Sequence, residues 1–297
     1  MAAITPDANR EAVGAFTTVH HDTYPFISPE KADLSGKSVF VAGASKGIGR
    51  ETALSLAKAG CSKIAIGARS DISSLEKEIA KAAADAGRSA PQVISLKLDV
   101  TSEESVKAAA DQIGQAFGGA LDVLVCNAGN LETWVPLAES TPADWWQTYE
   151  INVKGTYLLN RFFIPLLLKS ETKTSILVSS YGALTVRPGA SGYQSSKFVV
   201  CRLAEFIAND YEKQGIVCLS LHPGGVKTEL AYNMPEEMWS WLVDEPALPA
   251  DTIVWLSKEH RPWLNGRFFS VSWDVEELES KKDEIVKRDL FKFRMVV

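Results

Sequence analysis

Short apolar segments alternate with helix-forming segments from residue 38 to residue 221, and this alternation limits the fold more than any other feature of the chain. Most of the segments are continuously apolar, as strands are when both faces of a sheet are covered. Strands that alternate with helices form right-handed βαβ units and a parallel sheet. The sequence therefore predicts an α/β fold, a doubly wound parallel sheet of about seven strands with helices on both faces. Six of these strands are expected at Val39–Ala42, Lys63–Ala68, Val93–Leu98, Leu121–Cys126, Ser175–Val178 and Ile216–Leu221.

The composition narrows the class of protein. Hydrophobic residues make up 46% of the 297 residues, and no repeat or composition break divides the folded part into two domains. The net charge of −6 argues against a nucleic-acid partner. No apolar run has membrane-spanning length and no signal peptide is visible, so we expect no membrane association and a cytoplasmic location. The four cysteines are widely spaced, which favours free thiols over a zinc site, and no metal is expected.

A glycine-rich turn joins the first expected strand to the first expected helix. Glycine lets the backbone approach a pyrophosphate, and a helix N-terminus offers N–H groups and a positive dipole to a phosphate. The spacing G-x-x-x-G-x-G differs from the commoner dinucleotide pattern, and a turn without a ligand is the alternative. The position between strand and helix favours nucleotide binding. The residues expected at a cofactor here are Gly43, Ser45, Lys46, Gly47, Ile48 and Gly49.

The end of the second expected strand indicates which dinucleotide would bind. An acidic residue there would bind the ribose 2′-hydroxyl, but Ala68 occupies this place and Arg69 follows it. A cation suits a 2′-phosphate, and Lys46 in the glycine turn could supply a second one. A solvated arginine at a strand end is the alternative. We favour the phosphate interpretation and expect NADP(H) as the cofactor.

Two further strand ends reach the same edge of the sheet, where open α/β folds bind ligands. Asp99 could accept a hydrogen bond from an adenine amino group, or it could cap the following helix, and the sequence favours neither. Asn127 could tie neighbouring strands together beneath a pocket. With these two, Val100, Ala128 and Gly129 are expected to line the cofactor site.

Tyr193 and Lys197 are four residues apart, so a helix places both on one face. A free tyrosine has a pKa near 10, and a neighbouring ammonium favours the phenolate and lowers that pKa. The pair could then move a proton at neutral pH. Ser180, at the end of the preceding strand, could hydrogen-bond the oxygen of a carbonyl or alcohol substrate. The alternative is an ordinary amphipathic helix in which Tyr and Lys occur by chance. The pair alone does not exclude this alternative, and only the other motifs argue against it.

Taken together, these motifs have the order and spacing of one family. The sequence resembles the classical short-chain dehydrogenase/reductase family over Lys37 to about Thr228, with a Rossmann-type fold. Both ends of the chain are similar to those of fungal members. The motifs are A-G-A-S-K-G-I-G from Ala42, D-V at Asp99, C-N-A-G from Cys126, I-N-V-K-G-T from Ile151, S-S at Ser179, Y-Q-S-S-K from Tyr193 and H-P-G-G-V-K-T from His222.

The resemblance implies a catalytic tetrad of Asn152, Ser180, Tyr193 and Lys197. Tyr193 would exchange a proton with the substrate oxygen that Ser180 holds, Lys197 would bind the nicotinamide ribose, and Asn152 would hold a water of the proton relay. Residues near the nicotinamide amide would be Pro223, Gly224, Val226 and Thr228. Ala42 replaces the usual threonine and Cys126 the usual asparagine, which leaves the expected activity unchanged.

Outside the motifs, we expect three regions. Residues 1–35 would form an N-terminal extension, 36–272 the dinucleotide-binding domain with a substrate lid at about 228–250, and 273–297 a tail with one helix at about 274–288. His20-His21-Asp22 could bind a metal, but a tail anchored by Tyr24, Pro25, Phe26 and Ile27 is the preferred interpretation. The lid is rich in Met and Trp, which suits a bulky, polyketide-like substrate or else an amphipathic helix packed on the body. These side chains are Tyr232, Met234, Met238, Trp239 and Trp241.

The resemblance implies an NADPH-dependent oxidoreductase that interconverts a ketone and a secondary alcohol. The alternatives are a non-redox cyclisation or isomerisation in the same pocket, and an NADP-binding sensor without turnover. The expected partners are a small-molecule substrate and a second copy of the chain, as a homodimer or homotetramer. The shared face would use the helix before the fifth strand and the Tyr193 helix, unless a chain end covers it. Substrate identity and direction of reaction are not encoded in a recognisable way.

Overall fold

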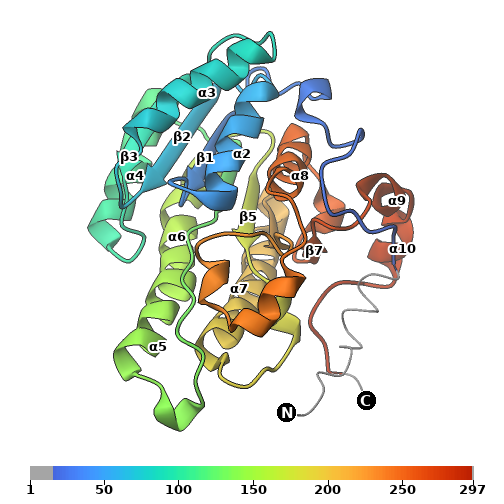
Figure 1. Ribbon diagram of the computed structural model, residues 1–297. Coiled ribbons are helices and arrows are strands. Elements are labelled where there is room, and N and C mark those ends of the chain that lie inside the picture. The colour runs from blue at the N-terminus through green and yellow to red at the C-terminus, as the bar shows by residue number, and fades with distance from the viewer. Residues whose placement is uncertain (1–15, 296–297) are drawn as a thin grey trace.

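The computed structural model describes residues 16–295, and these form a sheet of seven parallel strands (Figure 1). The strand order is β3-β2-β1-β4-β5-β6-β7, so the chain winds outward from β1 on one side and from β4 on the other. This confirms the doubly wound α/β fold. The strands are β1 (Ser38–Ala42), β2 (Lys63–Ala68), β3 (Gln92–Lys97), β4 (Val123–Cys126), β5 (Thr174–Val178), β6 (Val217–His222) and β7 (Phe268–Ser270).

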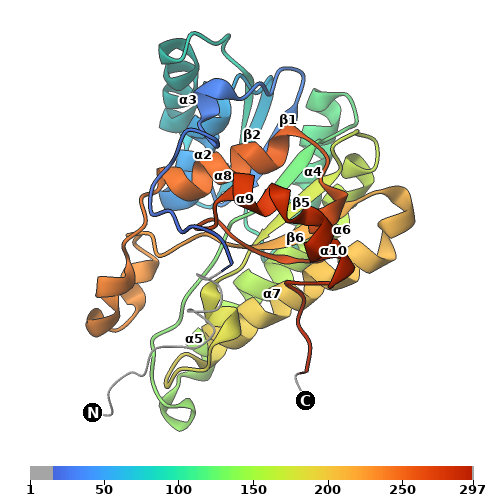
Figure 2. The same cartoon turned by 90° about the vertical axis from the view of Figure 1, so that its right-hand side faces the viewer.

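Helices cover both faces of this sheet. α2, α3 and α8 pack on one face, where α8 lies beside α2 (Figure 2), and α4, α6 and α7 pack on the other. The continuous apolar character of the strands is explained by this double coverage. The helices are α2 (Gly47–Lys58), α3 (Ser73–Asp85), α4 (Glu103–Phe117), α5 (Pro142–Tyr149), α6 (Gly155–Leu167), α7 (Ser191–Asp210) and α8 (Ala247–Lys258).

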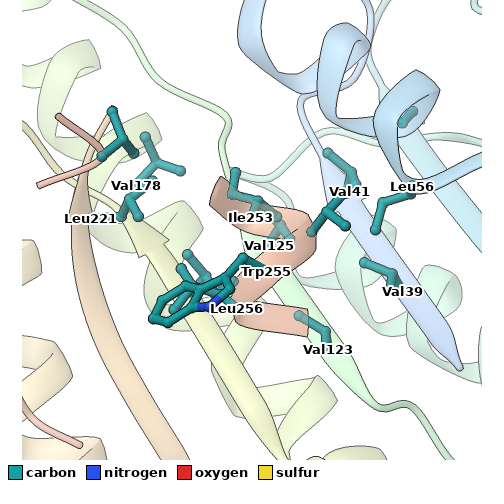
Figure 3. Close-up of a cluster of buried hydrophobic side chains, with 14 of the residues drawn as sticks. Val39, Val41, Leu56, Val123, Val125, Val178, Leu221, Ile253, Trp255 and Leu256 are labelled. Carbon is teal, nitrogen blue, oxygen red and sulfur yellow. The ribbon is translucent and has the colours of Figure 1, made fainter. Parts of the chain in front are cut away.

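Figure 3 shows the core between the sheet and the α2–α8 layer. Leu56 of α2 and Ile253 of α8 are completely buried, and Trp255 of α8 is 5% exposed. They meet valines of β1 and β4 that are also completely buried. Replacing one such side chain by alanine typically costs about 2–5 kcal/mol, so this packing holds the strand ends firmly in place.

The carboxyl ends of three central strands lie side by side. Ala42 of β1 is opposite Cys126 of β4, and Cys126 is opposite Leu177 of β5. The glycine turn, Asn127 and Ser180 follow these positions in the chain. The register therefore gathers at one edge three motifs that are far apart in the sequence.

The helix expected before the fifth strand contains an irregular turn. α5 continues through a π-helical segment, Glu150–Lys154, into α6. A π-helical segment inserts an extra residue into the helical ladder and is frequent at functional sites. Here it includes Asn152, which is completely buried.

The N-terminal extension is described from Phe16 onward, and it lies over the body as expected. Its preferred anchors are only partly confirmed: Ile27 is 2% exposed and the Tyr24 hydroxyl accepts from Val275 N–H at 2.8 Å, but Phe26 is 40% exposed. His20 and His21 contact two different carboxylates, Asp274 and Asp244, at 2.8 and 2.6 Å. Residues 1–15 of the predicted extension lie outside the described part of the chain.

The single helix expected at about 274–288 is wrong. Two short helices occur, α9 (Val275–Ser280) and α10 (Lys282–Lys287), and they are separated at Lys281. The Lys281 ammonium contacts the Phe16 carbonyl and lies 4.8 Å from the Phe16 ring centroid, so a tertiary contact fixes the break. Beyond α10, Phe291 C=O accepts from Phe268 N–H of β7 at 2.8 Å, and the chain covers this strand edge. Within residues 16–295, every helix is too short or too polar to cross a lipid bilayer.

Candidate active site

The glycine turn is held in contact with the end of β4. Gly43 has φ +90°, and a Cβ there would lie 2.6 Å from the Ala128 nitrogen. The Asn127 side-chain amide donates to the Gly43 carbonyl at 2.7 Å, which confirms that Asn127 ties neighbouring strands together. A Cβ at Gly49 would lie 2.2 Å from the same carbonyl oxygen. Both glycines are therefore required by close backbone approach, and the turn leaves the N-terminus of α2 open for a ligand.

A cavity of about 590 Å³, here called the turn cavity, lies in front of this turn. It contains most of the residues predicted to bind a dinucleotide, and it extends along the strand ends from Arg69 to Lys197. Its volume is large enough for such a cofactor. Its residues also fit, because the glycine turn at the N-terminus of α2 lets a phosphate approach the backbone. The predicted residues in its wall are Gly43, Ser45, Lys46, Gly47, Ile48, Arg69, Asp99, Val100, Asn127, Ala128, Gly129, Tyr193, Lys197, Pro223 and Thr228. Gly224 and Val226 line a neighbouring cavity instead, and Gly49 serves the turn itself.

The two cations predicted near a 2′-phosphate have different surroundings. Arg69 is exposed at the end of β2 and lines the turn cavity together with the buried Ala68. Lys46 also lines the cavity, but its ammonium forms an exposed ion pair with the Glu229 carboxylate. Arg69 is thus the more available cation.

Asp99 does not cap the following helix. Its Oδ1 accepts from the Thr101 N–H at 2.9 Å and from the Thr101 hydroxyl at 2.8 Å, and the N–H bond is the main cause that lowers the pKa of Asp99. The cap of α4 is Ser102, whose hydroxyl accepts from Ser105 N–H at 3.1 Å. The capping alternative for Asp99 is therefore wrong. Both bonds use the same carboxylate oxygen, and the side chain still reaches the wall of the turn cavity.

Ser180 and Tyr193 meet across the β5 end and the start of α7. The Ser180 hydroxyl accepts from Gly182 N–H at 2.9 Å, and a Cβ on Gly182 would lie 3.2 Å from that oxygen and 3.6 Å from the Tyr193 ring. Burial raises the pKa of Tyr193, a hydrogen bond with Ser180 opposes this effect, and the Glu132 charge adds to it. The expected lowering of the Tyr193 pKa is therefore wrong for the chain without ligands.

Lys197 lies beside Tyr193 and is itself buried. It is 4% exposed, its ammonium donates to the Val178 carbonyl at 2.8 Å, and it lies 5.6 Å from the Tyr193 ring centroid. Burial lowers the pKa of Lys197 to about 8. The lysine therefore remains largely protonated at neutral pH, although it releases its proton more readily than an exposed ammonium would.

Asn152 is fixed by neighbours on two segments, the loop after β4 and α7. Its Oδ1 accepts from Asn130 N–H at 2.8 Å, and its Nδ2 donates to the Asn130 carbonyl at 2.9 Å and the Ser196 hydroxyl at 3.0 Å. A Cβ on Gly129 would lie 3.5 Å from Asn152 Oδ1 and 3.6 Å from Lys197 Nζ. The π-helical segment thus brings Asn152 to the same place as the lysine. All four predicted catalytic residues gather at this edge of the sheet.

A second cavity, of about 430 Å³ and here called the lid cavity, adjoins the first and shares Tyr193 with it. Ser180 and Gln194 lie in its wall together with three of the five predicted lid side chains, Met234, Met238 and Trp241. The other two, Tyr232 and Trp239, pack on each other with ring centroids 4.9 Å apart. The lid consists of short 3₁₀ turns, Ala231–Asn233 and Glu236–Trp241, so the amphipathic-helix alternative is wrong.

Comparison with known proteins decides the family. The sequence pattern described as short chain dehydrogenase matches residues 37–239. The chain belongs to the short-chain dehydrogenase family. It is 50% identical over 278 residues to short chain dehydrogenase mpl6 of Monascus purpureus, which covers 94% of this chain and 95% of the relative. It is 44% identical to short chain dehydrogenase pigC of Monascus ruber, over 94% of this chain and 93% of that protein. The similarity to fungal members is thus confirmed.

A solved structure has the same fold. A short chain dehydrogenase from Shigella flexneri, complexed with NADP, superposes with a TM-score of 0.71 at 28% identity, over 81% of this chain and 99% of that one. The family assignment makes this short-chain dehydrogenase an oxidoreductase.

Three residues near the site of this dehydrogenase have contacts that the sequence did not indicate. Asp244 accepts from Gly225 N–H at 2.5 Å and also contacts His21, so it joins the lid to the loop after β6 and to the N-terminal segment. His21 lines the lid cavity itself. Glu132, in the loop after β4, is 2% exposed and accepts from the Tyr193 N–H at 2.8 Å. Each stands in a loop without periodicity, and its partner is remote in sequence.

Proposed function

We propose that this short-chain dehydrogenase interconverts a ketone and a secondary alcohol with NADP(H), using Tyr193 as the general acid and base. The observation that carries the proposal is that Tyr193 lines both cavities. One cavity has the predicted cofactor residues in its wall, and the other is mainly apolar. A proton donor at their boundary can serve a carbonyl in the lid cavity that receives a hydride from the turn cavity.

The side chains then have distinct tasks. Tyr193 gives its proton to the developing alkoxide, and the Ser180 hydroxyl hydrogen-bonds the same oxygen. Lys197 is close to both Gly129 and the Tyr193 ring, so it can bind the cofactor in the turn cavity. When Lys197 is protonated, its charge favours the phenolate of Tyr193. Asn152 holds the Asn130 backbone in register beneath them. Bound NADPH would supply the hydride.

The lid cavity supports a bulky apolar substrate. Its wall combines Met234, Met238, Trp241 and Leu242 of the lid with Trp134 from the loop after β4. Methionine and tryptophan fit irregular apolar surfaces, and a volume of about 430 Å³ suits a ligand with several rings or a long chain. Two polar side chains in its wall, His21 and Gln194, would orient oxygen substituents.

The preference for NADP(H) rests on the end of β2. Ala68 has no carboxylate that would repel a 2′-phosphate, and the Arg69 guanidinium can donate two parallel N–H groups to the phosphate oxygens. The similarity to a structure with NADP supports this choice. Glu229 holds Lys46, so we assign most of the preference to Arg69.

Nicotinamide absorbance with a panel of ketones and alcohols tests the reaction. Wild type should consume NADPH with a bulky ketone, and Tyr193→Phe should lower kcat at least about a hundredfold, because general acid catalysis is typically worth about 10²–10⁴. Tyr232→Phe, at an exposed tyrosine of the lid, is the matched control and should keep wild-type turnover. A Tyr193→Phe variant with more than about a tenth of wild-type kcat would show another proton donor. Product without change in absorbance would instead favour cyclisation or isomerisation.

Titration with both reduced cofactors tests the specificity. A charge-assisted contact to phosphate contributes about 1.5–3 kcal/mol, or about ten- to a hundredfold in affinity. NADPH should bind more tightly than NADH by this factor, Arg69→Ala should remove most of the difference, and Ala68→Asp should reverse it. Glu229→Gln should strengthen NADPH binding because it releases Lys46. Equal affinities in wild type would mean that Arg69 points into solvent.

A further inference from the structure

Glu132 is a buried carboxylate next to the proposed acid, and the reaction described above gives it no role. It lies in the loop between β4 and α5 and is 2% exposed. Its Oε1 accepts from Tyr193 N–H at 2.8 Å, while its Oε2 is buried without a hydrogen-bond partner among the described residues. Burying a carboxylate with one oxygen unpartnered costs folding free energy, so the presence of Glu132 here calls for an explanation beyond packing.

Its position is the N-terminus of α7. This helix of twenty residues begins at Ser191, and the residue before it, Ala190, has no side chain that can cap the free N–H groups. Tyr193 is the third residue of the helix, and Glu132 accepts from it across 61 positions of sequence. A carboxylate is stabilised there by the helix dipole.

Gly192 makes room for this arrangement. A Cβ at this position would lie 3.0 Å from the Glu132 carboxyl carbon and from its Oε1, and 3.2 Å from its Oε2. The carboxylate therefore lies flat against the first turn of the helix. The glycine of the G-Y-x-x-x-K stretch is explained by this contact rather than by a turn.

The carboxylate also acts on the tyrosine side chain. The groups that face Tyr193 are Lys197 on the same helix, Ser180 at the end of β5 and Glu132 on the loop after β4. Lys197 and Ser180 favour the phenolate, whereas the negative charge of Glu132 favours the phenol. Among these, Glu132 alone both fixes the backbone of Tyr193 and opposes loss of its proton.

We propose that Glu132 is a positioning residue, which fixes Tyr193 at the start of α7 and by its charge keeps the side chain a phenol ready to donate to a carbonyl. The inference rests on the proposed role of Tyr193 as the acid. Reduction of a ketone requires the phenol form, so the Glu132 charge would extend to higher pH the range in which reduction is fast. Burial and the Glu132 charge both raise the pKa of Tyr193, in agreement with this role.

Two variants separate the cap from the charge. Glu132→Gln keeps an oxygen for the Tyr193 N–H and removes the charge, whereas Glu132→Ala removes both. In Glu132→Gln the alkaline limb of the kcat profile for reduction should move to lower pH by about half a unit or more, with kcat at neutral pH within about threefold of wild type. Glu132→Ala should show the same shift and a further loss of kcat of about tenfold or more, since Tyr193 loses its anchor.

The matched control is Asp144→Asn. Asp144, in the first turn of α5, accepts from Thr133 N–H at 3.0 Å, next to Glu132 in the chain, so this variant removes a carboxylate that contacts the same loop. It should leave the pH profile unchanged. A Glu132→Gln profile that coincides with wild type, or moves to higher pH, would overturn the proposal, and this variant decides even if Glu132→Ala does not fold.

A second measurement does not depend on turnover. Ultraviolet titration of tyrosinate, taken as the difference between each protein and its Tyr193→Phe counterpart, reports the ionisation of Tyr193 alone. Removal of the Glu132 charge should lower that midpoint. A lowered midpoint in a protein that reduces no ketone would support the Glu132 inference and refute the proposed function, and an unchanged midpoint would refute the inference whatever the activity.

Discussion

Replacing Lys197 by methionine should change how the stability of this protein depends on pH. Lys197 is 4% exposed, and burial lowers its pKa from the ordinary 10.5 to about 8. Methionine has a similar length and no charge. The unfolded chain keeps the lysine proton up to about pH 10.5, whereas the folded chain releases it near pH 8. Between these values the unfolded state binds more protons, so the free energy of unfolding of the wild type rises with pH.

The size of this effect follows from the two pKa values. One pKa unit corresponds to about 1.4 kcal/mol, so the shift as a whole is worth about 3 kcal/mol. Between about pH 7 and about pH 9.5 the wild type should gain about 2 kcal/mol relative to Lys197→Met. The free energy of unfolding of Lys197→Met should compare best with that of the wild type near neutral pH, because there the wild type buries a charged ammonium. The variant should also lose turnover. Turnover reports the contribution of Lys197 to the chemistry, whereas urea unfolding reports its effect on stability.

Urea unfolding of the cofactor-free proteins at several pH values measures the difference. Lys81→Met is the control, since Lys81 is exposed on α3 beside Asp85 and its removal should leave the pH dependence as in wild type. Parallel curves for wild type and Lys197→Met would refute the reasoning. They would mean that Lys197 keeps an ordinary pKa in the folded chain and that water reaches it from the turn cavity.

Three further outcomes are expected. Gly43→Ala should abolish cofactor binding in a fluorescence titration, because its Cβ would lie 2.6 Å from the Ala128 nitrogen; wild-type affinity would show that the turn adapts. Asp244→Ala should lower the free energy of unfolding in urea by about 1–3 kcal/mol, because the partly buried Gly225 N–H loses its acceptor; an unchanged midpoint would show that water replaces it. Sedimentation should find a homodimer or homotetramer, since large apolar side chains such as Phe206, 59% exposed, remain on α7; a monomer at micromolar concentration would contradict this.

The sequence predicts the repetitive part of the molecule well. Each of the six expected strands is found with its ends moved by no more than two residues, because a buried parallel strand needs continuous apolar residues and turn residues at its ends. The tetrad gathers as expected, since the register of β1, β4 and β5 follows from the same pattern.

Features that depend on contacts between remote segments were not predictable. The break at Lys281 depends on Phe16, and the cap of α7 depends on Glu132, which belongs to a loop without periodicity. The direction of the Tyr193 pKa was mistaken because residue spacing indicates that Lys197 is near, but it does not reveal the burial of the tyrosine or the Glu132 charge, which both raise this pKa.

The contact between the two chain ends has a consequence for synthesis on the ribosome. Thr18 donates to Glu277 through its N–H at 3.0 Å, a pairing that spans 259 residues, and Val19 pairs with Trp273 in an antiparallel bridge. The segment around Thr18 thus finds its partners only when the segment around Trp273 and Glu277 has been made. Val19 and His21 line the lid cavity, so its wall is completed only after nearly the whole chain has emerged. A nascent chain lacking the last helices can fold its central strands, but it holds an open and incomplete substrate cavity until translation ends.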